Sequence, residues 1–148
     1  AMHQRQAAYY DALNVAQRGD GEVTPWLEWF LDTYTEASRT SAELIGEALA
    51  RARFWTDHRA VPLNEMQRRV LGRMLDAGPG RFDGGLTARK YTVIAGTTRV
   101  TASRHIADLL KKGLIVRAAG PSGRSTRYDL ALPGWEWRPT MKRRVAAE

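Results

Sequence analysis

The chain contains no cysteine, which excludes disulfide bonds and zinc sites built from thiolates. Its three histidines, His3, His58 and His105, lie too far apart in the sequence to indicate a metal cluster. No uninterrupted apolar run approaches the roughly 20 residues that span a bilayer, and the polar residues 1–5 do not resemble a signal peptide. These absences predict a cytoplasmic protein that does not enter the membrane.

Recognisable catalytic patterns are also missing. The sequence has no serine, histidine and acid arrangement, no glycine-rich phosphate loop and no paired-carboxylate motif. We therefore expect that this chain is not an enzyme by itself and holds no metal or other cofactor.

The charge is distributed unevenly along the 148 residues, whose formal net charge is +7. Residues 1–60 contain 6 Lys or Arg and 9 Asp or Glu, a net charge of −3, whereas residues 61–148 contain 17 and 7, a net charge of +10. A strongly basic half is typical of proteins that bind polyanions, although charged side chains also serve solubility. The asymmetry points to double-stranded DNA as a candidate partner of the second half.

Residues 1–60 predict a helical segment. One apolar face favours an amphipathic helix over residues 4–16, and Gly19-Asp20-Gly21 would end it. Thr24 and Pro25 favour the start of a second helix, because threonine caps backbone amides and proline is tolerated in the first turn. Its stripe of apolar and small residues alternates four and three positions apart: Leu27, Leu31, Tyr34, Ser38, Ser41, Ile45, Ala48, Ala52 and Trp55.

This second helix would be about 50 Å long if it continued to His58 without a break. A helix of that length either breaks near residues 39–41 or packs along another helix, in this chain, in a missing part of a larger protein or in a second copy. Ser38 and Ser41 favour the close approach of another element over a leucine-zipper seam. Homodimerisation through the long helix is one hypothesis. Trp26 and Trp29 share the apolar side and indicate packing more than stacking on single-stranded nucleic acid.

Residues 61–135 predict a second domain, and residues 136–148 a basic tail. Asn64 and Gln67 fit a capping box that opens a helix with Val70, Leu71, Met74 and Leu75 inward. After a glycine-rich connection, Thr87 predicts a short helix over residues 88–95, and Gly96 a tight turn. Thr98 predicts a further helix with four apolar residues facing the core, namely Ala102, Ile106, Leu109 and Leu110, and Gly113 ends it.

A hairpin is predicted after these helices. Residues 114–116 and 126–132 favour strands, and Gly120-Pro121-Ser122-Gly123 favours the turn between them. Phe82 and Leu86 indicate a short first strand that could pair with the hairpin. The predicted fold is therefore mainly α, with an N-terminal helical hairpin or long helix followed by a winged helix-turn-helix of three helices and a small β-hairpin wing.

The predicted DNA-binding residues lie on the last helix and on the wing: Thr98, Arg99, Val100, Thr101, Ser103, Arg104, Arg124 and Arg127. Val100 and Arg104 would face the major groove, and the hydroxyl groups would reach phosphates near the helix start. Arg117 flanks the wing, and Arg89 and Lys90 open the first helix of the motif. His105 is expected at the edge of the core. The outward helix face has few base-reading side chains, which leaves protein interaction or homodimerisation without DNA as the alternative.

Five stretches resemble the C-terminal portion of Fic-family proteins, and they lie at residues 9–13, 19–20, 24–31, 54–55 and 63–67. Residues 101–106 and 123–128 are similar to the winged helix that many such proteins carry after the Fic core. The resemblance implies a parent that transfers AMP from ATP with the help of a divalent metal. The family's H-P-F-x-x-G-N-G-R motif is absent here, so the resemblance implies a non-catalytic fragment whose partner is the missing Fic core. His105 and Met66 depart from the aspartate and arginine usual in the family.

Overall fold

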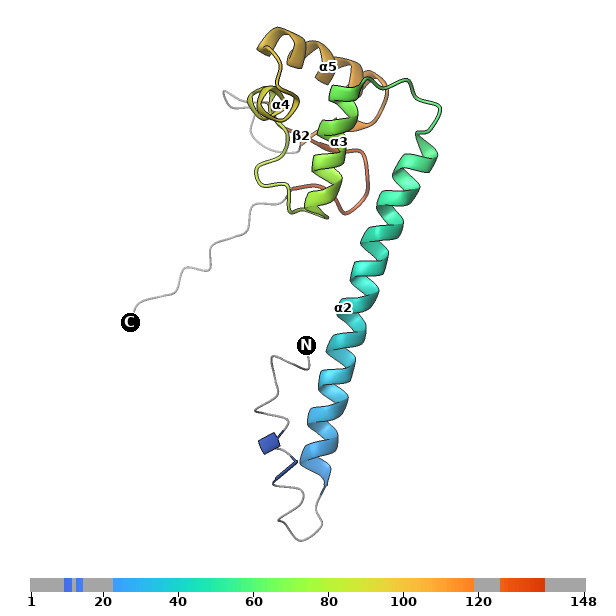
Figure 1. Ribbon diagram of the computed structural model, residues 1–148, viewed down its shortest axis with the longest axis vertical. Helices are drawn as coiled ribbons and strands as arrows, with labels where there is room; N and C mark the ends of the chain where they lie inside the picture. The colour runs from blue at the N-terminus through green and yellow to red at the C-terminus, as the bar shows by residue number, and fades with distance from the viewer. Residues whose placement is uncertain (1–9, 12, 15–22, 119–125, 138–148) are drawn as a thin grey trace, which may run out of the picture. The chain divides into compact units, whose positions relative to one another are not determined.

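The computed structural model describes residues 10–11, 13–14, 23–118 and 126–137. The fold is mainly helical with a small antiparallel sheet of two strands (Figure 1), as the sequence predicts. Residues 1–50 and 51–148 form two separate units. Four residues of the predicted helix over 4–16 are described, and all are helical: Tyr10, Asp11, Leu13 and Asn14. Four predicted features lie outside the described residues: the rest of that helix, its stop at Gly19–Gly21, the turn at 120–123 and the tail beyond 137.

Helix α2 runs unbroken from Thr24 to Asp57. The predicted alternative of a break near residues 39–41 is therefore wrong, and the reason lies in the local hydrogen bonds. The hydroxyl groups of Thr40 and Ser41 each donate to a backbone carbonyl one turn earlier, at 2.9 Å, so these polar side chains are satisfied without leaving the helix. The first helical residue is Thr24 itself, and the backbone amide of Leu27 donates to the carbonyl of Val23.

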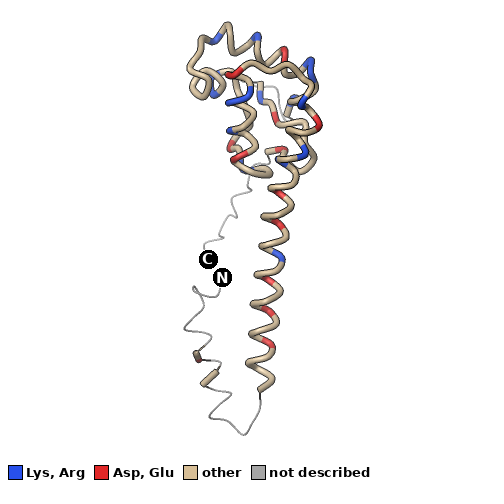
Figure 2. Tube along the Cα trace, turned by 45° about the vertical axis from the view of Figure 1, so that its right-hand side comes forward, with Lys and Arg blue, Asp and Glu red and all other residues tan. Residues whose placement is uncertain are grey.

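The part of α2 that belongs to the first unit has two unlike sides. Thr33 is buried, and the half-buried ring of Trp26 stacks on Phe30 at 5.5 Å between centroids. Leu31, Tyr34 and other large apolar side chains are exposed. Acidic positions are spaced along this helix, whereas basic positions are concentrated in the second unit (Figure 2).

Three capped helices build the second unit. Helix α3 (Glu65–Ala77) begins with the predicted capping box between Asn64 and Gln67, and its predicted inward residues are buried. Helix α4 (Ala88–Ala95) begins at the Thr87 cap and ends at Gly96, whose φ of 63° is the left-handed conformation that glycine adopts without strain. Helix α5 (Arg99–Lys111) begins at the Thr98 cap.

The sheet closes the core of this unit. Strand β1 (Ile115–Arg117) pairs with β2 (Tyr128–Leu130). Where a short first strand was predicted, the structure has a single bridge between Leu86 and Tyr128, so only the contact of this segment with the hairpin is confirmed. Strand β1 has the predicted length but begins one residue later, whereas β2 is shorter than the predicted 126–132. The core that they cover contains, among others, Tyr91, Leu71 and Leu109, all of which have no exposed surface.

A polar network ties α3 to α5 at the edge of the core. The side-chain amide of Gln67 donates to the Asp108 carboxylate at 2.7 Å, and Lys112 donates to the same carboxylate and to the carbonyl of Pro62. His105 lies half-buried beside it, with Nδ1 2.9 Å from the Tyr91 hydroxyl, which confirms its expected position at the core edge. Burial, with a smaller effect of Asp108, raises the pKa of Tyr91 to about 12, so this hydroxyl stays neutral.

Candidate nucleic-acid interface

A groove of about 700 Å³ opens between α4, α5 and the two strands. We call it the arginine groove, because α4 contributes Arg89, α5 contributes Arg99 and β1 contributes Arg117. Its other lining residues are Ala88, Thr92, Ser103, Ile106, Ala107, Leu110, Thr126 and Tyr128. The groove thus combines three guanidinium groups with four hydroxyl groups over an apolar floor.

The arginines of this groove are not neutralised by the surrounding protein. None of the lining residues that the structure describes is acidic. The backbone carbonyl of Arg89 accepts from the Thr92 hydroxyl at 2.7 Å, but the guanidinium groups of Arg89, Arg99 and Arg117 form no hydrogen bond or ion pair with another described residue. A planar guanidinium donates two parallel hydrogen bonds to a phosphate or carboxylate, so three unpaired arginines around one groove suit a polyanion.

The acidic residues of α5 and β2 are turned away from the arginine groove. Asp108, on α5, accepts hydrogen bonds from Lys112 and Gln67 on the side that meets α3, and these bonds, with Lys112 the larger effect, lower the pKa of its carboxyl. Asp129 follows Tyr128 on β2 and therefore points to the opposite face of the sheet. Only 4% of Asp129 is exposed, and burial raises the pKa of its carboxyl. Neither carboxylate lines the groove.

The six predicted site residues at or on α5 fall into three sets. Arg99 and Ser103 line the groove. Val100, 72% exposed, and Arg104 lie on the adjoining outward face of α5. Thr98 and Thr101 lie at the N-terminus of α5.

Thr98 and Thr101 are hydrogen-bonded to each other. The hydroxyl of Thr98 accepts from the backbone amide of Thr101 and donates to its hydroxyl at 3.1 Å. Their first task is therefore to cap the helix. The guanidinium of Arg127 lies 5.3 Å from the centroid of the Trp137 ring, a cation–π contact, whereas Arg124 lies outside the described residues.

The list of predicted binding residues omitted several that line the groove. Thr92 follows Arg89 by three residues and so shares its side of α4, a signal that was present in the sequence. Tyr128 lies opposite Arg117 in the strand register. The sequence predicted that the two strands pair, but it did not predict which residues lie opposite each other.

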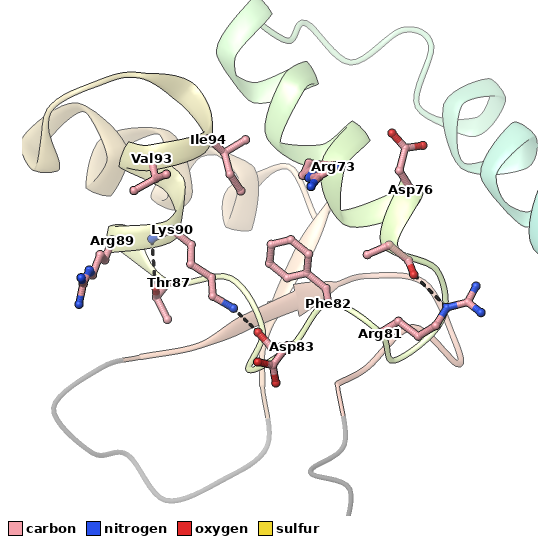
Figure 3. A pocket seen from close by; sticks show the side chains of 11 residues that line it. Arg73, Asp76, Arg81, Phe82, Asp83, Thr87, Arg89, Lys90, Val93 and Ile94 are labelled. Atoms are coloured by element: carbon pink, nitrogen blue, oxygen red, sulfur yellow. Dashed lines mark hydrogen bonds between the residues drawn. The ribbon is translucent and has the colours of Figure 1, made fainter.

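A second groove, of about 650 Å³, lies on the other side of α4 and is shown in Figure 3. We call it the α3–α4 groove. Phe82, Ile94 and Val93, which is 77% exposed, give it apolar surface. Its charged lining residues are Arg73, Asp76, Arg81, Asp83, Arg89 and Lys90. Lys90 donates to the backbone carbonyls of Asp83 and Gly85 and lies 4.9 Å from the Phe82 ring centroid, so its charge is held by the scaffold. Arg89 lines both grooves, and the α3–α4 groove differs from the arginine groove in its two acidic lining residues.

No protein-family model matches the chain, and a search of curated proteins finds no match either. Within the described ranges, no helix is long and apolar enough to cross a membrane. The same residues contain no group of three or more His, Cys, Asp or Glu side chains that could hold a metal ion.

Proposed function

We propose that residues 61–135 are a winged helix-turn-helix domain that binds double-stranded DNA. The observation that carries this proposal is the arginine groove, where α4, α5 and β1 each place one unpaired arginine and no described lining residue is acidic. The order of α3, the Leu86 bridge, α4, α5 and the β1–β2 pair supports it, because a winged helix has this order of elements.

In this proposal the groove and the outward face of α5 have separate tasks. Arg89, Arg99 and Arg117 contact backbone phosphates, while Val100 and Arg104 reach base edges in the major groove. Phosphate contacts position a protein on DNA without reading its sequence. We therefore expect binding that depends strongly on salt and weakly on sequence.

The proposal is tested by fluorescence anisotropy with a labelled duplex of about 20 base pairs, titrated at several salt concentrations. The logarithm of the association constant falls linearly with the logarithm of the salt concentration, and each phosphate contact that is lost makes this slope less steep by about 0.9. Alanine at Arg89, Arg99 and Arg117 together should weaken binding to any duplex and flatten that slope. Arg104→Ala should weaken binding further and reduce any preference between duplexes.

The matched control is Arg69→Ala, because Arg69 is an exposed arginine on α3 that pairs with Glu65 at 2.9 Å and lies outside the groove. The control should bind DNA as the parent chain does. Absence of binding at low salt, or equal losses in the control and in the triple variant, would contradict the proposal.

We also propose that the chain is the C-terminal, non-catalytic part of a Fic-family protein, on the basis of the residue order described above. The ATP, the divalent metal and the transfer of AMP would then belong to the parent protein. Reading the coding sequence upstream of Ala1 tests this proposal, since a Fic parent must encode the H-P-F-x-x-G-N-G-R type of motif there.

A second candidate function is docking of the same domain on the catalytic part of that parent, and the α3–α4 groove favours it. Its exposed Val93, its apolar side chains and its two acidic residues, Asp76 and Asp83, suit a mixed protein surface better than a phosphate backbone. Val93→Glu should then prevent docking, measured by calorimetry against the catalytic part, and leave the DNA titration unchanged. Loss of DNA binding in this variant would argue against separate surfaces.

A further inference from the structure

Seven exposed residues of α2 form a row whose spacing is the same when read from either end. They are Leu27, Leu31, Tyr34, Ser38, Ala42, Ile45 and Leu49, separated by four, three and four positions on each side of Ser38. At about 100° per residue they occupy an arc of about 80° on the helix surface. We call this row the symmetric stripe. It lies entirely within the first unit.

The symmetric stripe is the apolar side of α2 that the described structure leaves open. Leu31, Tyr34 and Ile45 are 58%, 61% and 60% exposed, and the other four members are exposed as well. The stripe contains no charged residue. Single exposed apolar side chains are common on proteins, but a continuous row of them marks an interaction surface.

We propose that a second copy of this chain lies antiparallel over the symmetric stripe, with a twofold axis at Ser38. This goes beyond DNA binding and does not depend on it. A twofold axis there brings Leu27 against the partner's Leu49 and Leu31 against the partner's Ile45. It also seats the large ring of Tyr34 over the partner's Ala42, and the two small Ser38 side chains meet on the axis.

The parallel arrangement fits the same residues less well. It would place Tyr34 against the partner's Tyr34 and Ala42 against the partner's Ala42. The two tyrosine rings would then compete for the same space, and the two small alanines would leave a gap between the helices. The antiparallel arrangement pairs large with small. The eleven-residue steps from Leu27 to Ser38 and from Ser38 to Leu49 correspond to about 3.7 residues per turn, so two nearly straight helices stay in register.

The size of the stripe indicates how strong this dimer is. From Leu27 to Leu49 it is about 33 Å long, and a helix face about 10 Å wide gives a strip of about 330 Å². A strip of that size matches the apolar patches that mark interaction sites, and it is smaller than the about 800 Å² per partner of a standard interface. We expect a reversible dimer that forms at micromolar concentrations.

Because the chain has no cysteine, any disulfide between two chains must come from a cysteine that is introduced by substitution. Disulfide crosslinking of single-cysteine variants therefore tests which residues face each other in the dimer. Ser38→Cys should form a disulfide-linked dimer under mild oxidation, since the two residues meet on the axis. Leu27→Cys alone and Leu49→Cys alone should not crosslink, whereas a mixture of the two should. Efficient self-crosslinking of Leu27→Cys would overturn the antiparallel geometry, and so would failure of Ser38→Cys to crosslink.

Sedimentation velocity of the unmodified chain tests the dimer independently of any crosslink. The sedimentation coefficient should rise between about 1 and 100 μM. Leu31→Glu should abolish that rise, because it places two charges in the contact. Thr40→Glu is the matched control, since Thr40 is exposed on the opposite side of α2, and it should behave as the parent chain does. A monomer at all concentrations, or equal effects of the two substitutions, would overturn the proposal.

Discussion

The two units of this chain differ in how far their large apolar side chains are exposed to solvent. In the second unit Leu71, Tyr91 and Leu109 have no exposed surface, because α3, α4, α5 and the sheet cover one another. In the first unit the described part of α2 exposes more than half of Leu31 and of Tyr34. The comparison teaches that the second unit buries a core of its own, whereas the described residues of the first unit leave the symmetric stripe exposed.

Leucine truncation should show this difference most strongly. Leu109→Ala leaves a cavity in the core of the second unit, and we expect it to lower the free energy of unfolding by about 2–5 kcal/mol. Leu31→Ala removes an exposed side chain and should change it by less than about 0.5 kcal/mol at concentrations where the chain is monomeric. Urea denaturation followed by circular dichroism measures both. Equal losses would show that the two leucines have similar environments.

Alanine in place of glycine should have opposite effects in the two units. Gly85 has a φ of +64°, and an added Cβ would lie 3.2 Å from the carbonyl oxygen of Tyr128, beside the Leu86 bridge. Gly85→Ala should therefore destabilise the chain by about 1–3 kcal/mol. An added Cβ at Gly46 meets nothing within 4 Å, so Gly46→Ala should stabilise α2 by about 0.5–1 kcal/mol. Thermal melting of the two variants gives the signs, and the same sign in both would contradict this account.

Removal of a helix cap should have a smaller effect. Asn64→Ala deletes the side chain that accepts from the Gln67 amide at 2.8 Å, and we expect a loss of about 1 kcal/mol in urea denaturation. Asn64→Asp, which keeps the acceptor, should recover most of it. A loss that Asn64→Asp does not recover would assign the effect to the contact with His105 instead.

The smallest effect that we expect is a pH dependence from the network between α3 and α5. The pKa of Asp108 is lowered in the folded chain, so its contribution to stability is present above the unfolded pKa of about 3.9 and is lost as pH falls through the lower, folded value. Asp108→Asn should therefore reduce the dependence of unfolding free energy on pH below about 4. Urea titrations at several acidic pH values, with Asp83→Asn as the exposed control, measure it.

Local signals in the sequence predicted much of the second unit. The caps Asn64, Thr87 and Thr98 each act within three residues, so they can be recognised without knowing the fold. The arginine groove could not be predicted in full, because Arg117 and Tyr128 join it only through the strand register. Lys90 gave a misleading signal. Its charge suggested a surface contact, but its side chain donates to the backbone carbonyls of Asp83 and Gly85 in the loop that precedes α4.

The symmetric spacing around Ser38 also bears on how tightly this protein would hold a long DNA duplex. Two chains joined at the symmetric stripe carry two arginine grooves, so one dimer offers two DNA-binding surfaces. Binding of a long duplex by one groove would then raise the effective concentration of DNA at the second groove, so that a dimer of modest stability gains affinity. Anisotropy titrations with a long duplex should show tighter binding by the parent chain than by Leu31→Glu, while a duplex of about 20 base pairs should bind both chains alike.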